Sequence, residues 1–209
     1  MAEELHLEIL PEEQLRLLQL LSGETFIRDF YLAGGTGLAL YLGHRQSFDF
    51  DFFIPTDFDT SQIVNILTGL GKYERSNEEK NTVNGLLNGV RVSFLGYKYD
   101  IIDEFSHYQS IRLAGIRDIA SMKLEAIAGR GSKKDFVDMY FMLNQFTLEQ
   151  IFSFHALKYG VGLSNQYHHL KSLVYFNDAD EEAMPLITSP LKWDKVKAKI
   201  RSCVDKFQP

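Results

Sequence analysis

The chain has 209 residues, of which 45% are hydrophobic, so it can bury a sizeable core as one large domain or two small ones. Its net charge of −6 argues against general binding to a nucleic-acid backbone. A single cysteine excludes an internal disulfide framework, while the acidic start of the chain and the lack of a long apolar run predict a cytoplasmic protein with no membrane partner.

The first half of the chain alternates helical and strand patterns. A proline followed by glutamates, with a glycine at the end, predicts a helix over Pro11–Gly23. Asn88-Gly89 is a strong signal for a tight hairpin between two strands. The other elements expected here are a helix Thr36–Leu42, a strand Phe48–Ile54, a helix Gln62–Leu70, an irregular strand near Tyr73, and strands Thr82–Leu87 and Val90–Leu95. This order predicts an α/β (α+β) fold with a mixed sheet and flanking helices.

From Ile116 onward the pattern becomes helical. A break is expected at Gly129–Ser132, and an acidic loop at residues 178–182. The expected helices are Ile116–Ala128, Lys133–Asn144, Leu148–Lys158 and a lysine-rich, amphipathic last helix near Lys192–Lys206. We therefore expect an α/β domain over residues 1–110 and a helical region over residues 111–209.

Two aspartates, Asp49 and Asp51, are the strongest functional signal. Side chains two apart on a strand share a face about 6.7 Å apart, so Phe48, Phe50 and Phe52 would enter the core while both carboxylates face the other way. Two such charges repel by about 2.5 kcal/mol at an effective dielectric constant of about 20. A divalent cation, Mg²⁺ or Mn²⁺, that carries a nucleoside triphosphate (NTP) is the usual reason for such a pair.

The residues around this pair are suited to phosphate. Gly34, Gly35 and Thr36 would let backbone N–H groups approach a phosphate at a helix start. Arg45 and Ser47, beside the strand, are candidates for further phosphate contacts. The alternative is structural, with the glycines forming a tight turn and Thr36 acting as a helix N-cap. The pattern as a whole predicts a nucleotidyltransferase site.

Two motifs carry a family resemblance. The segment GGTGLALYLGHRQSFDFDFF, from Gly34 to Phe53, resembles the first motif of the AbiEii-type nucleotidyltransferases, a toxin branch of the DNA polymerase β-like superfamily. The segment MKLEAIAGRGSKKDFVD, over residues 122–138, resembles the family's later pattern of Lys, six residues, Arg, three residues and Lys-Asp. The resemblance implies a magnesium-dependent enzyme that moves a nucleoside monophosphate from an NTP to an acceptor. It also implies membership of a toxin–antitoxin pair, with a cognate antitoxin and a tRNA or protein acceptor as candidate partners.

The second motif supplies three candidate site residues. Lys123 would bring a positive charge to the phosphates, and Arg130 could add a planar two-point contact. Asp135 would act as a base, a metal partner or an orienting group for Lys123, or else simply belong to a capping pattern begun by Ser132. Asp138 is expected to be solvated or to lie behind the residues that contact the nucleotide.

One departure keeps two other functions open. The superfamily usually places a third carboxylate on a neighbouring strand, and the candidate strand here carries Ser93 instead. A catalytically silent binding module is therefore one alternative, and an RNA-binding protein that uses the basic last helix is another. His168-His169 lacks a partner at ligand spacing, so the sequence favours no metal site there.

Overall fold

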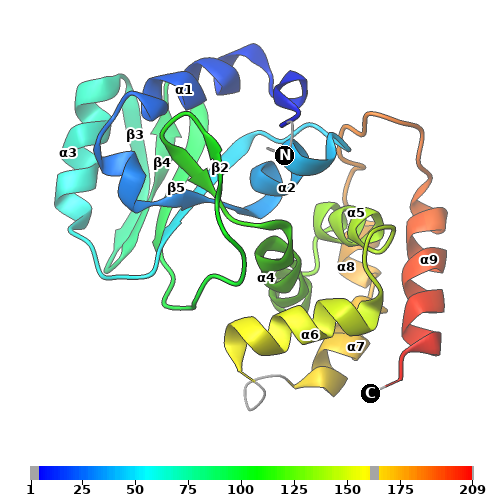
Figure 1. Ribbon diagram of the computed structural model, residues 1–209. Coiled ribbons are helices and arrows are strands. Elements are labelled where there is room, and N and C mark those ends of the chain that lie inside the picture. Colours follow the sequence, from blue (N-terminus) through cyan, green and yellow to red (C-terminus); the bar gives the residue numbers. More distant parts are fainter. Residues whose placement is uncertain (1–4, 161–164, 209) are drawn as a thin grey trace.

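A seven-stranded mixed sheet forms one lobe of the computed structural model, which describes residues 5–160 and 165–208 (Figure 1). The strand order is β3-β4-β5-β2-β1-β7-β6; β2 runs parallel to β5 and β1 parallel to β7, and the other neighbouring pairs are antiparallel. The strands are β1 (Tyr31–Leu32), β2 (Asp49–Ile54), β3 (Tyr73–Glu79), β4 (Thr82–Leu87), β5 (Val90–Gly96), β6 (Ser106–Tyr108) and β7 (Ile111–Leu113).

The later helices form a second lobe beside the sheet, and α2 and α4 lie between the two lobes (Figure 1). Two short 3₁₀ helices, η1 (Leu7–Ile9) and η2 (Phe26–Asp29), precede the sheet. The α-helices are α1 (Glu12–Ser22), α2 (Gly34–Leu42), α3 (Thr60–Leu70), α4 (Ile116–Gly129), α5 (Lys133–Met142), α6 (Leu148–Tyr159), α7 (Gln166–Leu173), α8 (Asn177–Asp180) and α9 (Trp193–Lys206). None of the helices within the described residues is long and apolar enough to cross a membrane.

The two faces of β2 differ as the alternating sequence predicts. Phe50 and Phe52 are buried in a core that also contains apolar residues of α1 and α3. Asp49 and Asp51 therefore lie on the opposite face, because successive strand residues alternate. The expectation for Phe48 was wrong: this residue precedes the strand, and 45% of it is exposed.

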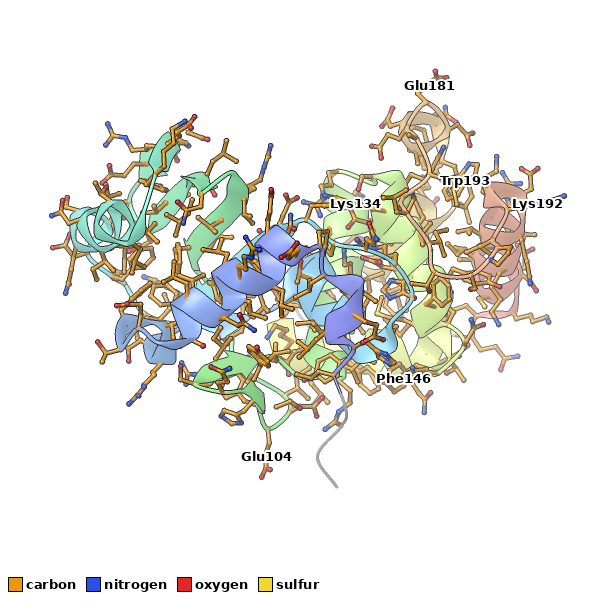
Figure 2. All side chains as sticks on the ribbon, turned by 90° about the horizontal axis from the view of Figure 1, so that it is seen from above. Glu104, Lys134, Phe146, Glu181, Lys192 and Trp193 are labelled. Atoms are coloured by element: carbon orange, nitrogen blue, oxygen red, sulfur yellow. The ribbon has the colours of Figure 1, made fainter. Side chains whose placement is uncertain are left out.

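A second core joins the sheet to the helical lobe. Tyr31 and Phe53 of the sheet belong to the same buried cluster as Leu124 of α4 and Phe136 of α5. On the far side, Trp193 of α9 packs edge-on against Phe136, and Figure 2 shows it between the last two helices. The face of β2 that carries the aspartates is consequently turned toward α4 and α5.

Most expected elements are present, with ends that differ by a few residues. The short strands β1, β6 and β7 and the helix α7 were not anticipated, and β7 carries the sheet to Leu113, beyond the boundary expected at residue 110. The acidic segment expected as a loop begins instead with the short helix α8, which Trp193 and Lys197 bind through the side chain of Asp180.

Candidate active site

The turn from β1 into α2 brings the backbone against two charged side chains. Gly34 has a φ of +64°, and a Cβ added there would lie 2.7 Å from Asp51 Oδ2. A Cβ added at Gly35 would overlap with Arg45 Nη2. Both positions therefore require glycine, the first for its left-handed conformation and both for close approach. Phosphate binding by these two glycines stays a prediction.

Thr36 ties the start of α2 to the strand that carries the aspartates. Its hydroxyl is buried, hydrogen-bonds to the backbone carbonyl of Asp49 and lies 2.8 Å from Ser47 Oγ. Because a carbonyl can only accept, Thr36 donates to Asp49 and can accept from Ser47. The N-cap alternative for Thr36 was wrong, since the N-cap residue of α2 is Ala33. These hydrogen bonds give Thr36 and Ser47 a structural role, and direct phosphate contact by either stays a prediction.

The two aspartates of β2 lie in different surroundings. The Asp49 side chain is 38% exposed, with Lys134 Nζ 3.7 Å from its Oδ2 and Arg91 Nε 3.8 Å from its Oδ1. Asp51 is more enclosed, and burial raises its pKa, helped by the negative charge of Asp49, although a hydrogen bond with Ser93 opposes this. Asp51 is thus a carboxylate whose charged form lacks sufficient positive compensation.

Ser93 occupies the position on the neighbouring strand where the family resemblance implies a third carboxylate. β5 pairs in parallel with β2, and the register sets Ser93 directly beside Asp51. The sequence-based placement of this residue is therefore confirmed. Its hydroxyl hydrogen-bonds with the Asp51 side chain, so it contributes a neutral group where a further acidic ligand would lie.

Lys123 of α4 lies between two fully buried carboxylates of α5. Its Nζ is 2.8 Å from Asp135 Oδ1 and 2.6 Å from Asp138 Oδ2, and the residue is only 3% exposed. The attraction of the two carboxylates outweighs burial, which alone would lower the pKa of Lys123, so its pKa is raised and it stays charged. Lys123 is therefore held rigidly below the pocket surface.

Asp138 is the centre of this ion network and is fully buried, so of the two alternatives expected for it the solvated one was wrong. Arg45 binds it with two parallel hydrogen bonds, Nε to Oδ1 at 2.7 Å and Nη2 to Oδ2 at 3.0 Å. His44 Nε2 lies 2.8 Å from the same Oδ1. Burial would raise the pKa of Asp138, but Lys123 and Arg45 outweigh it and hold the pKa well below its usual range. Arg45 thus has a structural partner, and its contact with phosphate stays a prediction.

Asp135 accepts hydrogen bonds from three side chains, one on α4 and two in the break between α4 and α5. Besides Lys123, it accepts hydrogen bonds from Arg130 Nε at 2.8 Å and from Ser132 Oγ at 2.7 Å. Burial would raise its pKa, but Lys123 and Arg130 hold it far below the usual range, so this carboxylate is a poor base. Ser132 is the N-cap residue of α5, but its hydroxyl donates to Asp135 and makes no capping bond to the backbone. The geometry thus favours the orienting role among those considered for Asp135.

A pocket of about 340 Å³ opens beside Asp51. Its polar wall is formed by Asp51, Lys123, Glu125 and Arg130. The Arg130 side chain is 60% exposed, which leaves it accessible to a ligand. The remaining wall is largely apolar and aromatic, formed by Phe53, Leu95, Tyr97, Ile119 and Met122. A pocket with one charged and one apolar wall fits a ligand that is itself part phosphate and part flat ring.

Three residues of this site were not among the site residues predicted from the sequence. Lys134 projects toward Asp49, and Figure 2 shows it on the helical lobe near the sheet lobe. It is the Lys of the Lys-Asp pair in the second motif, which was the available signal. His44 had no such signal, and the second motif contained Asp138 without revealing this contact, because the two residues are 94 positions apart in the sequence.

Known proteins resemble this chain in sequence. Residues 16–100 match the model of a family described as "Nucleotidyl transferase AbiEii toxin, Type IV TA system". The chain is 39% identical over 180 residues to the uncharacterized protein aq_aa25 of Aquifex aeolicus (strain VF5), covering 83% of this chain and 86% of that one.

Solved structures share the fold. JHP933 from Helicobacter pylori superposes with a TM-score of 0.55 at 16% identity, covering 94% of this chain and 92% of that chain. MenT4, a nucleotidyltransferase toxin from Mycobacterium tuberculosis H37Rv, gives a TM-score of 0.55 at 13% identity, covering 92% of this chain and 81% of that chain. At these identities the likeness concerns the fold alone, and it extends over both lobes.

Proposed function

The chain belongs to the AbiEii family of nucleotidyl transferase toxins and is a nucleotidyltransferase; we propose that it uses Mg²⁺ or Mn²⁺ to move a nucleoside monophosphate from an NTP to tRNA or a protein. The single observation that carries the proposal is the placement of Asp49 and Asp51 on one face of β2, against the backbone of Gly34 and beside the pocket that contains Arg130. A cognate antitoxin is the partner that the family suggests.

The residues present fit a divalent metal ion. Mg²⁺ and Mn²⁺ prefer carboxylate oxygens, which Asp49 and Asp51 supply from adjacent positions on one strand face. The raised pKa of Asp51 shows that its negative charge is undercompensated in the protein alone. A bound ion would supply positive charge to the triphosphate and stabilise the departing pyrophosphate.

The other charged residues of the site compensate one another. Four carboxylates, including Asp49 and Asp51, face four cations besides the exposed Arg91, so a divalent ion would leave the site with the net positive charge that a triphosphate requires. The carboxylates are Asp49, Asp51, Asp135 and Asp138, and the cations are Arg45, Lys123, Arg130 and Lys134.

Exposure divides these cations into two groups. Arg130 and Lys134 are partly exposed and can reach phosphate oxygens from the α5 side, whereas Arg45 and Lys123 are buried. In the transfer itself an acceptor oxygen bonds to the α-phosphorus as the bond to pyrophosphate breaks, a reaction that needs mainly alignment and charge from the protein. Asp135 serves this alignment by holding both Lys123 and Arg130.

Transfer of label tests the proposal. The protein is incubated with NTPs labelled at the α-phosphate, Mg²⁺ and either total tRNA or a cell extract; label in a macromolecule is expected with the unaltered protein and absent with Asp51→Asn. Asp59→Asn is the matched control, because Asp59 caps α3 in the sheet lobe and Asn retains that cap. Equal label with Asp51→Asn would refute the assigned site.

The presence of Ser93 in place of a third carboxylate favours one alternative function, a catalytically silent module that binds NTP. The position of Ser93 beside Asp51 leaves a hydroxyl where a third acidic ligand would strengthen metal binding. Binding of a fluorescent NTP that depends on Asp51, without transfer of label to any acceptor, would favour this alternative. RNA binding through the lysines of α9 predicts instead a steep salt dependence in the absence of NTP.

A further inference from the structure

Three polar side chains from three different helices converge next to the proposed transfer site, away from Asp49 and Asp51. Glu125 lies on α4, His155 on α6 and His169 on α7. His155 Nε2 is 2.5 Å and His169 Nε2 is 2.8 Å from the same atom, Glu125 Oε1. Both imidazole rings are buried, whereas the Glu125 side chain is 45% exposed.

The hydrogen bonding of His169 is what requires explanation. Its Nδ1 lies 3.0 Å from the backbone carbonyl of Asn165, and a carbonyl can only accept, so Nδ1 carries the proton. In the neutral ring, Nε2 then carries a lone pair and faces the carboxylate of Glu125. Two hydrogen-bond acceptors, His169 Nε2 and Glu125 Oε1, would thus lie 2.8 Å apart with no proton between them. A cation at this position removes the conflict by accepting both lone pairs.

His155 approaches the same point from α6. Its Nδ1 is buried and has no hydrogen-bond partner in the part of the chain that the structure describes, so Nε2 is the nitrogen available to Glu125. The ring centroids of His155 and His169 are 4.7 Å apart, and the three donor atoms all lie within 4.8 Å of one another. Such spacing lets a single ion reach all three with small side-chain adjustments.

We propose that Glu125, His155 and His169 bind a divalent transition metal ion, in the first place Zn²⁺. Two imidazole nitrogens and one carboxylate oxygen are a donor set that Zn²⁺ accepts with a further position open. The contact of His169 Nδ1 with a carbonyl is the outer hydrogen bond that metal-binding histidines usually make. Mg²⁺ prefers oxygen ligands, so this site is chemically distinct from the pair Asp49 and Asp51.

The location gives the ion access and a structural consequence. Glu125 lines both the 340 Å³ pocket and a neighbouring one of about 350 Å³ formed with Tyr97, Tyr99 and Tyr159, so an ion can enter from solvent. Because each ligand comes from a different helix, the bound ion would link α4, α6 and α7. The first of these helices also carries Lys123.

Metal binding to the whole protein, stripped with a chelator and kept free of NTP and Mg²⁺, tests the proposal. Co²⁺ is expected to give the visible absorption of a nitrogen- and oxygen-bound ion at one equivalent per chain. Zn²⁺ at about 100 times its dissociation constant is expected to raise the melting temperature by about 5–10 °C. Absence of both effects in the unaltered protein would overturn the proposal and favour a metal-free ion pair with a doubly protonated His169.

Matched variants locate the ion. Glu125→Gln and His169→Gln keep similar size and should weaken Co²⁺ and Zn²⁺ binding by about 100-fold or more, beyond the 10–100-fold usual for supporting residues. His168→Gln, the exposed neighbour on α7, should bind as the unaltered protein does. Asp51→Asn should also retain binding, which separates this site from the transfer site. Undiminished binding by both Glu125→Gln and His169→Gln would refute the assignment.

Discussion

Asp51 and Asp138 belong to the same site, yet the protein shifts their pKa values in opposite directions. Burial raises the pKa of each, but Lys123 and Arg45 reverse that effect only at Asp138. At Asp51, burial and the charge of Asp49 outweigh the opposing effects of Ser93, Lys123 and Arg130, and the pKa stays raised. The difference separates two uses of a carboxylate: Asp138 fixes cations in place, whereas Asp51 is, in the proposed function, left for a cation that arrives with the substrate.

The largest expected effect is on folding and comes from the compensated side of this comparison. Asp138→Asn leaves Lys123 and Arg45 buried without their shared counter-charge, and we expect it to lower the free energy of unfolding by about 3–5 kcal/mol. Urea unfolding of the variant and of the unaltered protein measures this loss. Asp49→Asn is the control, because that half-exposed carboxylate should change stability by no more than about 0.5 kcal/mol. A similar loss in both variants would mean that the buried network has no special structural role.

The second effect, on catalysis, comes from the uncompensated side. Asp51→Asn should lower label transfer by about 10²–10³-fold, the range for removing one electrostatic stabiliser. The variant should fold normally, since removal of a charge near Asp49 relieves repulsion. Thermal unfolding in the absence of metal checks this, and a marked fall in melting temperature would show that Asp51 supports the fold rather than a cation.

A glycine substitution probes the space between backbone and carboxylate. In Gly34→Ala the new methyl group would lie 2.7 Å from Asp51 Oδ2 at a φ of +64°. We expect a loss of about 1–2 kcal/mol in unfolding free energy from the left-handed conformation, together with weaker Mg²⁺-dependent NTP binding. Gly69→Ala is the control, because that helical position has open space and should gain about 0.5–1 kcal/mol. Unchanged NTP binding in Gly34→Ala would argue against close approach of phosphate at this turn.

The two sides of the comparison also differ in how much of them the sequence reveals. The Asp49–Asp51 face follows from a period of two over the first four residues of β2, and strand pairing then sets Ser93 beside it. Arg45 and Asp138 are 93 positions apart, and their pairing exists only once α5 packs beside the α2–β2 loop. For the same reason the second motif predicted that Lys123 and Asp135 matter but left the role of Asp135 open.

Short or isolated features were predicted least well. β6 and β7 have three residues each, too few for a periodic pattern, and their position comes from pairing at the sheet edge. Glu125, His155 and His169 lie on three different helices, so no local spacing could predict that they meet. Phe48 shows the opposite error, in which a local alternation was extended one residue past the start of the strand.

The smallest expected effect is the pH dependence of stability, where the two carboxylates should act with opposite sign. The folded pKa of Asp138 lies below the value of about 3.9 in an unfolded chain, so its stabilisation is complete above that pH and is lost as the pH falls below it. The pKa of Asp51 is raised, so its contribution is present at low pH and is lost as the pH rises. Urea unfolding of the metal-free protein at a series of pH values measures the sum of these two contributions to the free energy of unfolding.

Variants separate these two contributions to the pH profile. Asp138→Asn should flatten the fall in stability at acidic pH, whereas Asp51→Asn should remove the part that declines as the pH rises. Added Mg²⁺ should act like the second substitution, because a bound cation gives the charged form of Asp51 the partner that the chain itself does not provide. If Mg²⁺ does not change the pH profile of the unaltered protein while Asp138→Asn behaves as expected, the role of the buried network would be supported. The proposal that Asp51 of β2 binds a metal ion would then be refuted.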